Sequence, residues 1–163
     1  YGILFDRDFF DYLSETGMEF DREYVIERSV AMKRDVVDRD EFDVGARKLL
    51  NLGHTIGHSV EANSRFTLSH GQSVAIGTAI VARAAAAKGI LSMEDCGRIL
   101  KTLRAYGLPV ETGDAPEILA EIALSDKKRS GGTLDLIVPE AIGSCKVLPV
   151  LVSDVLDWIQ EGM

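Results

Sequence analysis

The sequence has 163 residues, enough for one domain with a sizeable core, and its 46% share of hydrophobic residues is ordinary for a globular protein. The formal net charge of −8 argues against nonspecific binding to nucleic acid or to an anionic membrane, because both favour a basic surface. The net charge does not exclude a small anionic ligand, since a local cluster of Lys and Arg can be positive on a protein of negative overall charge.

The first part of the chain predicts helices that begin at capping aspartates. Asp6 caps a short helix that ends at Gly17, and Asp21 caps a longer one with apolar residues at helical spacing. A third helix is expected over residues 46–62, and residues 63–69 read as a loop.

The rest of the chain predicts further helices and one hairpin. The uncharged segment 66–82 lies mostly within a buried helix, because a membrane span needs about 20 strongly apolar residues. The expected elements are helices over 70–88, from Ser92 to Tyr106, from Asp114 to Leu124 and from Ser153 onward, with strands over 133–138 and 144–150. The predicted fold class is mainly α: one multi-helical bundle over residues 1–163, with a small β-hairpin near the C-terminus.

The cysteines and the start of the chain favour a cytoplasmic location. Cys96 and Cys145 lie far apart and form no paired motif, so we expect ordinary reduced thiols. The opening residues carry no basic segment of the kind that precedes a secretion signal. We therefore expect a cytoplasmic protein with neither a membrane nor a nucleic acid as its partner.

All three histidines fall within 17 residues, and this clustering is the sharpest feature of the sequence. His54 and His58 lie four residues apart and so share a helix face, while His70 opens the next helix and can fold back toward them. Neutral imidazoles are common zinc ligands, and a catalytic zinc usually has three protein ligands and a water. The pattern predicts a metal or anion site whose third ligand is the third histidine or a carboxylate.

A polar stripe is predicted beside the histidines. Arg47, Asn51, His54 and His58 follow one another at steps of four, three and four residues, and Lys33 lies further upstream. On one helix, this places a guanidinium, an amide and two imidazoles on one face. The combination suits a carboxylate or phosphate, which Arg binds in a bidentate manner.

Each of two glycine-containing segments is compatible with two interpretations of its role. Gly53 and Gly57, within the expected third helix, indicate a close approach to that backbone by either a second helix or a ligand. Lys127 and Lys128, followed by glycines at 131–132, form either a loop that closes over a phosphate or a plain solvated loop.

Several motifs together resemble the 3-dehydroquinate synthase family. Residues 50–58 read LNLGHTIGH, a highly specific match, and residues 70–75 read HGQSVA, similar to the family's H-G-E-x-V-A. Residues 33–47 resemble the family's K-x-x-V-V-x-x-D-E segment and its Gly-x-Arg, and the opening Tyr-Gly-Ile resembles the end of its K-Y-G-I motif. The likeness covers essentially the whole chain.

This resemblance implies a homodimeric enzyme of the shikimate pathway that acts on an anionic sugar phosphate. It implies zinc, or another divalent metal such as cobalt, held by His54, His70 and a glutamate upstream of Tyr1. It also implies NAD, bound mainly by an N-terminal α/β domain absent from this chain. The positions that match substrate-contacting residues are Lys33, Arg47, Asn51, His58 and one of Lys127 and Lys128.

Two departures from the family pattern keep other hypotheses open. Gln72 stands where the family usually has Glu, which favours either a weakened contact or a related cyclase acting on another sugar phosphate. No Gly-rich nucleotide-binding turn is present, so we expect this chain alone to be inactive. The alternatives are a sugar-phosphate cyclase, a metal-dependent polyol dehydrogenase, and a non-catalytic metal-binding or dimerisation module.

Overall fold

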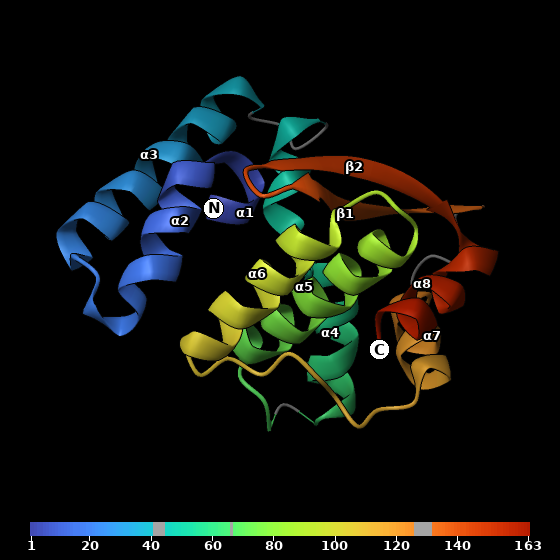
Figure 1. Cartoon of the computed structure of the whole chain (residues 1–163). Helices are drawn as coiled ribbons and strands as arrows, with labels where there is room; N and C mark the ends of the chain where they lie inside the picture. Colours follow the sequence, from blue (N-terminus) through green and yellow to red (C-terminus); the bar gives the residue numbers. More distant parts are fainter. Residues whose placement is uncertain (41–44, 66, 126–131) are drawn as a thin grey trace.

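The computed structural model describes residues 1–40, 45–65, 67–125 and 132–163, and these form a bundle of helices with one hairpin along one side (Figure 1). The predicted fold class, mainly α with a C-terminal hairpin, is confirmed. In chain order the elements are α1 (Gly2–Phe5), α2 (Arg7–Thr16), η1 (Gly17–Glu19), α3 (Arg22–Arg39), η2 (Ala46–Asn51), α4 (His54–Asn63), α5 (His70–Ala87), α6 (Met93–Ala105), α7 (Pro116–Ala123), β1 (Thr133–Ala141), β2 (Ser144–Leu151), η3 (Val152–Asp154) and α8 (Val155–Gly162).

Most of the predicted helix starts are correct. The carboxylate of Asp6 accepts from the backbone N–H of Phe9, that of Asp21 accepts from two backbone N–H groups, and the Ser92 hydroxyl accepts from Asp95. The prediction that Ser153 caps the last helix is wrong. Its hydroxyl donates to the Asp154 side chain within η3, and α8 begins at Val155.

The helix predicted to start at Asp114 with Pro116 starts at the second of these residues. The helix begins at Pro116, a residue whose fixed φ suits the first helical position. The Asp114 carboxylate instead accepts hydrogen bonds from the side chains of Asn63 and Thr112. It therefore fixes the approach to α7 from the side of α4.

The single helix predicted over residues 46–62 is broken in two, and this is the main correction. Residues 46–51 form the 3-10 helix η2, and α4 begins only at His54. Between them Gly53 adopts the left-handed conformation with φ of 74°, which favours glycine. Helical spacing therefore does not place Arg47 and Asn51 on the same helix as His54 and His58.

The break exists because α4 and α5 approach each other unusually closely. A Cβ on Gly77 would lie 2.1 Å from the carbonyl oxygen of Gly53, and one on Gly57 would lie 2.9 Å from the carbonyl of Ser73. Both distances are shorter than Cβ contacts in real proteins, so only glycine fits at these positions. The glycine pair noted in the sequence thus serves helix–helix packing.

Helix α5 forms the centre of the core. It packs against α4, α6, α8 and β1, and its buried apolar residues include Ile76 and Ile80. Figure 1 shows α2 and α3 on one side of this helix and α7 and α8 on the other. None of the helices in the described ranges combines the length and apolarity needed to cross a membrane.

The hairpin closes one side of the core. Strands β1 and β2 are antiparallel, with Leu134 opposite Val150 and Leu136 opposite Leu148. β1 extends further toward the turn than predicted, whereas β2 begins at the predicted residue and ends one residue later. Pro139 lies within β1, beside a register irregularity. A proline is tolerated there because, in a two-stranded sheet, each strand has an unpaired edge.

A buried aspartate joins the hairpin to the N-terminal helices. The Asp95 carboxylate on α6 accepts from the Arg7 guanidinium at 2.8 Å and from the backbone N–H of Ile142 at 3.1 Å. Burial would raise the pKa of Asp95, but the bonds from Arg7 and Ile142 outweigh it and lower that pKa below its usual range.

Replacing Gly77 by Ala should destabilise the protein by about 2–3 kcal/mol or more, because the added methyl overpacks the α4–α5 contact. The matched control is Gly97→Ala in the exposed face of α6, where a Cβ meets nothing within 4 Å. That substitution should be neutral or stabilising by up to about 1 kcal/mol. Urea unfolding measures both, and equal stabilities of the two variants would contradict the packing argument.

Asp95→Asn should destabilise the fold by about 1–3 kcal/mol near neutral pH, because charge-assisted bonds are lost at a buried site. Since the folded-state pKa is lowered, the wild-type advantage is complete above the ordinary carboxyl pKa of about 4 and is lost as the pH falls through the folded value. Unfolding measured across acidic pH tests this, with exposed Asp157→Asn as control; a difference independent of pH would refute it.

Candidate metal centre and adjoining groove

The structure brings the three histidines together at the start of two helices. His54 is the first residue of α4, His58 lies one turn later, and His70 is the first residue of α5. Their ring centroids are 5.5 Å (His54–His58), 5.2 Å (His54–His70) and 5.6 Å (His58–His70) apart. The expectation that His70 folds back toward the other two is therefore correct.

Two of the rings have their tautomer set by hydrogen bonds. Nδ1 of His54 lies 3.1 Å from the carbonyl oxygen of Leu52, and Nδ1 of His70 lies 3.2 Å from a carboxylate oxygen of Glu61. Both oxygens only accept, so each Nδ1 carries the hydrogen when the ring is neutral. Nε2 of each ring then presents a lone pair, the state in which imidazole binds a metal.

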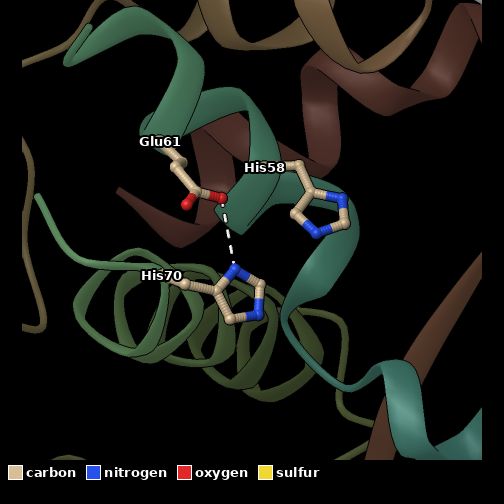
Figure 2. Close-up of side chains that lie close together, drawn as sticks. All are labelled: His58, Glu61 and His70. Carbon is tan, nitrogen blue, oxygen red and sulfur yellow. Dashed lines mark hydrogen bonds and ion pairs between the residues drawn. The ribbon is translucent and has the colours of Figure 1, made fainter. Parts of the chain in front are cut away.

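Glu61 adds a carboxylate to the cluster. Figure 2 shows Glu61 and His58 reaching from α4 toward His70, with the hydrogen bond between Glu61 and His70 drawn as a dashed line. Ligand atoms of His58, Glu61 and His70 lie within 4.8 Å of one another, a spacing compatible with a metal ion. The geometry thus offers two overlapping donor sets, one through His54 and His70 and one through His58, Glu61 and His70.

The electrostatics at His54 favour a neutral ring. Partial burial lowers the pKa of His54, and the carbonyl of Leu52 offsets only part of this effect. The neighbouring imidazoles of His58 and His70 lower the pKa further. A ring that resists protonation stays available as a ligand at neutral pH.

A polar groove of about 490 Å³ opens beside the histidines. One wall comes from η2 and α4 and the other from β1, and the Lys48 ammonium meets the Asp135 carboxylate at 2.8 Å between them. The lining residues are Lys48, Asn51, His54, Thr55, His58, Thr133, Leu134, Asp135 and Ile137. The groove therefore combines imidazoles, an amide and both signs of charge.

The other predicted site residues are less well gathered. Asn51 lines the groove although the helix expected to carry it is broken. Arg47 is half-buried on η2, where its backbone N–H donates to Asp40, and Lys33 is exposed on α3; among described residues, neither lines the groove. Lys127 and Lys128 lie outside the described residues.

Gln72, the departure from the family motif, has a clear local role. Its side-chain oxygen accepts from the backbone N–H of Ser69 at 2.9 Å, while the Ser69 hydroxyl accepts from the Gln72 N–H. This is a capping box at the start of α5. Gln and Glu serve equally in that motif, so the substitution preserves the placement of His70.

Three groove or cluster residues were missed by the sequence reasoning. Glu61 follows His54 and His58 at helical spacing, so the interval of seven residues from His54 could have indicated it. Lys48 and Asp135 gave no such signal, because they meet only when β1 folds against η2.

The fold and the site together define a helical domain that presents a cluster of histidines to a polar groove, an arrangement compatible with a metal ion and a polar ligand. Residues 1–129 match the family described as 3-dehydroquinate synthase C-terminal. The chain belongs to this family, and the resemblance stated from its motifs is confirmed.

Relatives of known name agree with this assignment. The chain is 37% identical to 3-dehydroquinate synthase of Ruegeria sp. (strain TM1040), over 100% of its own length and 48% of the relative's. It is 38% identical to 3-dehydroquinate synthase of Aliivibrio fischeri (strain MJ11), over 99% of its own length and 47% of the relative's. The chain thus spans about half the length of the curated relatives that it matches.

Solved structures of similar fold include two synthases. The 2-epi-5-epi-valiolone synthase ValA of Streptomyces hygroscopicus subsp. jinggangensis 5008, solved with NAD⁺ and Zn²⁺, superposes with a TM-score of 0.83 at 24% identity, covering 99% of this chain and 48% of that one. A 2-deoxy-scyllo-inosose synthase complexed with carbaglucose-6-phosphate, NAD⁺ and Co²⁺ gives 0.73 at 21%, covering 86% and 41%. These likenesses establish the fold alone.

Gln72→Glu should leave stability unchanged or raise it by up to about 1 kcal/mol, because the capping box persists and a negative charge is added at a helix N-terminus. Gln72→Ala should cost about 1 kcal/mol, since the Ser69 N–H loses its partner. Thermal unfolding of both variants measures this. A large loss of stability in Gln72→Glu would show that the position needs a neutral amide.

Proposed function

We propose that this chain is the metal- and substrate-binding half of a 3-dehydroquinate synthase. The complete enzyme converts 3-deoxy-D-arabino-heptulosonate 7-phosphate into 3-dehydroquinate with elimination of phosphate, a step of the shikimate pathway that leads to aromatic amino acids. The observation that carries the proposal is the convergence of three imidazoles beside a charged groove, within the family's characteristic motifs.

The centre fits a divalent cation such as zinc or cobalt, with His54 and His70 as its ligands. Each of these rings has Nδ1 engaged by an oxygen and Nε2 left with a lone pair, the arrangement typical of metal-bound histidine. The third ligand is proposed to be a glutamate upstream of Tyr1, by resemblance to the family. When bound, the metal supplies Lewis-acid polarisation of substrate oxygens and NAD supplies the hydride chemistry.

The groove residues are proposed to hold the substrate. His58 and Asn51 line the groove, where an imidazole and an amide can bind hydroxyl, carboxylate or phosphate oxygens. Lys48 brings a cation to the same wall. By resemblance Lys33, Arg47 and one of Lys127 and Lys128 contribute further positive charge, which stabilises an anionic substrate.

The family assignment favours the dehydroquinate reaction over that of another cyclase. The curated relatives at 37% and 38% identity are 3-dehydroquinate synthases, whereas the similar cyclases share at most 24%. The Gln72 departure, which indicated either a weakened contact or a related cyclase, keeps a capping box in which Gln and Glu both serve. The homodimer, the NAD-binding N-terminal domain and the cytoplasmic location remain part of the proposal.

The test is a paired measurement of metal binding and phosphate release in the complete gene product. Wild type should bind zinc and release phosphate from the heptulosonate phosphate. His54→Ala and His70→Ala should each lower zinc affinity by more than about 100-fold, the upper end of the cost of losing an outer partner. His58→Ala should keep zinc but lose turnover, because its proposed role is toward the substrate.

Each departure from this pattern has a distinct meaning. If His58→Ala loses zinc while His54→Ala keeps it, the ligands are His58, Glu61 and His70. If wild type binds zinc but releases phosphate only from another sugar phosphate, the chain belongs to a cyclase other than 3-dehydroquinate synthase. If wild type binds no zinc, the metal centre is refuted.

A further inference from the structure

A carboxylate that the proposed His54 and His70 ligand pair does not include lies against one of these two proposed ligands. Glu61 sits on α4, three residues after His58, and its side chain is 20% exposed. Its carboxylate oxygen lies 3.2 Å from Nδ1 of His70, which opens the neighbouring helix α5 (Figure 2). The contact therefore spans the seam between the two helices that form the centre.

We infer that Glu61 is a positioning residue that fixes the tautomer and orientation of His70 and thereby sets the metal affinity of the centre. This inference rests on the proposed function, in which His70 is a metal ligand. It adds to that function the residue of α4 that orients the metal ligand His70 of α5.

The first argument concerns the proton on the ring. A carboxylate only accepts a hydrogen bond, so Glu61 holds the hydrogen on Nδ1 of His70 and leaves the lone pair on Nε2. The ring of His70 is half exposed and, among the described residues, the bond to Glu61 is the hydrogen bond that holds it. The Leu52 carbonyl serves His54 in the same way, so both proposed ligands have matching outer partners.

The second argument concerns charge. His54 and His70 are the first residues of α4 and α5, so a cation between them faces the positive ends of two helix dipoles. A dication is disfavoured there unless negative charge lies nearby. The Glu61 carboxylate lies within 4.8 Å of donor atoms of His58 and His70, so its negative charge offsets this repulsion beside His70.

The third argument concerns rigidity. Glu61 follows His58 by three residues on α4, whose backbone is pressed against α5 at Gly57 and Gly53. Because this contact permits no side chain between the helices, the two backbones that carry the carboxylate and the ring lie close together. The hydrogen bond thus orients the His70 ring relative to the packed helices.

The first measurement is the tautomer of His70 in the metal-free complete gene product, read from ring ¹⁵N chemical shifts at alkaline pH. In wild type, His70 should carry its hydrogen on Nδ1. In Glu61→Ala the ring should shift toward the Nε2–H form, whereas Glu61→Gln, whose amide oxygen still accepts, should retain the wild-type form. Glu121→Ala, an exposed glutamate of α7, is the matched control and should change nothing.

The second measurement is Zn²⁺ affinity by competition with a chromophoric chelator. Glu61→Ala should lower the affinity about 10- to 100-fold, and Glu61→Gln should lower it less, because the ring stays oriented while the charge is lost. Glu121→Ala should bind as wild type. Equal loss in Glu61→Gln and Glu61→Ala, without a change of tautomer, would make Glu61 a direct ligand and overturn the positioning role.

The two measurements separate this inference from the proposed function. An unchanged His70 tautomer in Glu61→Ala, or unchanged zinc affinity in that variant, refutes the positioning role while leaving the metal centre intact. Failure of wild type to bind Zn²⁺ refutes the metal centre and with it the inferred effect on affinity, even where the tautomer responds as expected.

Discussion

The close contact between α4 and α5 is the constraint on which the site depends. Gly53, Gly57 and Gly77 let the two backbones approach to distances that exclude any side chain. The left-handed turn at Gly53 begins α4 at His54, and the capping box at Ser69 begins α5 at His70. Since each proposed ligand is the first residue of its helix, the contact that aligns the helices also sets the separation of the imidazoles.

Much of the fold could be predicted from the sequence because local signals and tertiary packing agree. The caps at Asp6, Asp21 and Ser92 form as expected, and the uncharged segment becomes the central helix α5. The prediction of a single helix over 46–62 was wrong because hydrophobic periodicity does not reveal a glycine at which the chain turns. Here Gly53 turns the chain so that a second helix can pack closely. The helices expected from Ser153 and from Asp114 begin two residues later, because the Ser153 side chain bonds to Asp154 and the Asp114 side chain bonds to Asn63.

The histidine cluster was predictable because its members are near one another in sequence and lie on two consecutive helices. The stripe was predicted for the wrong reason: Asn51 reaches the groove from η2, across the break, and not along a shared helix. Lys48 and Asp135 could not be paired from the sequence, since 87 positions separate them and only the folded hairpin joins them. The wall of the groove opposite the histidines thus forms only through tertiary folding and could not be predicted from sequence spacing.

The Lys48–Asp135 ion pair has a consequence for how this scaffold can diversify. One side of the groove belongs to the helices that carry the imidazoles, and the other belongs to β1, whose exposed positions are free of that packing constraint. Substitutions at Thr133 or Asp135 alter the width and polarity of the groove without disturbing the helix seam. Such a division lets the wall of the groove change while the histidine cluster stays in place.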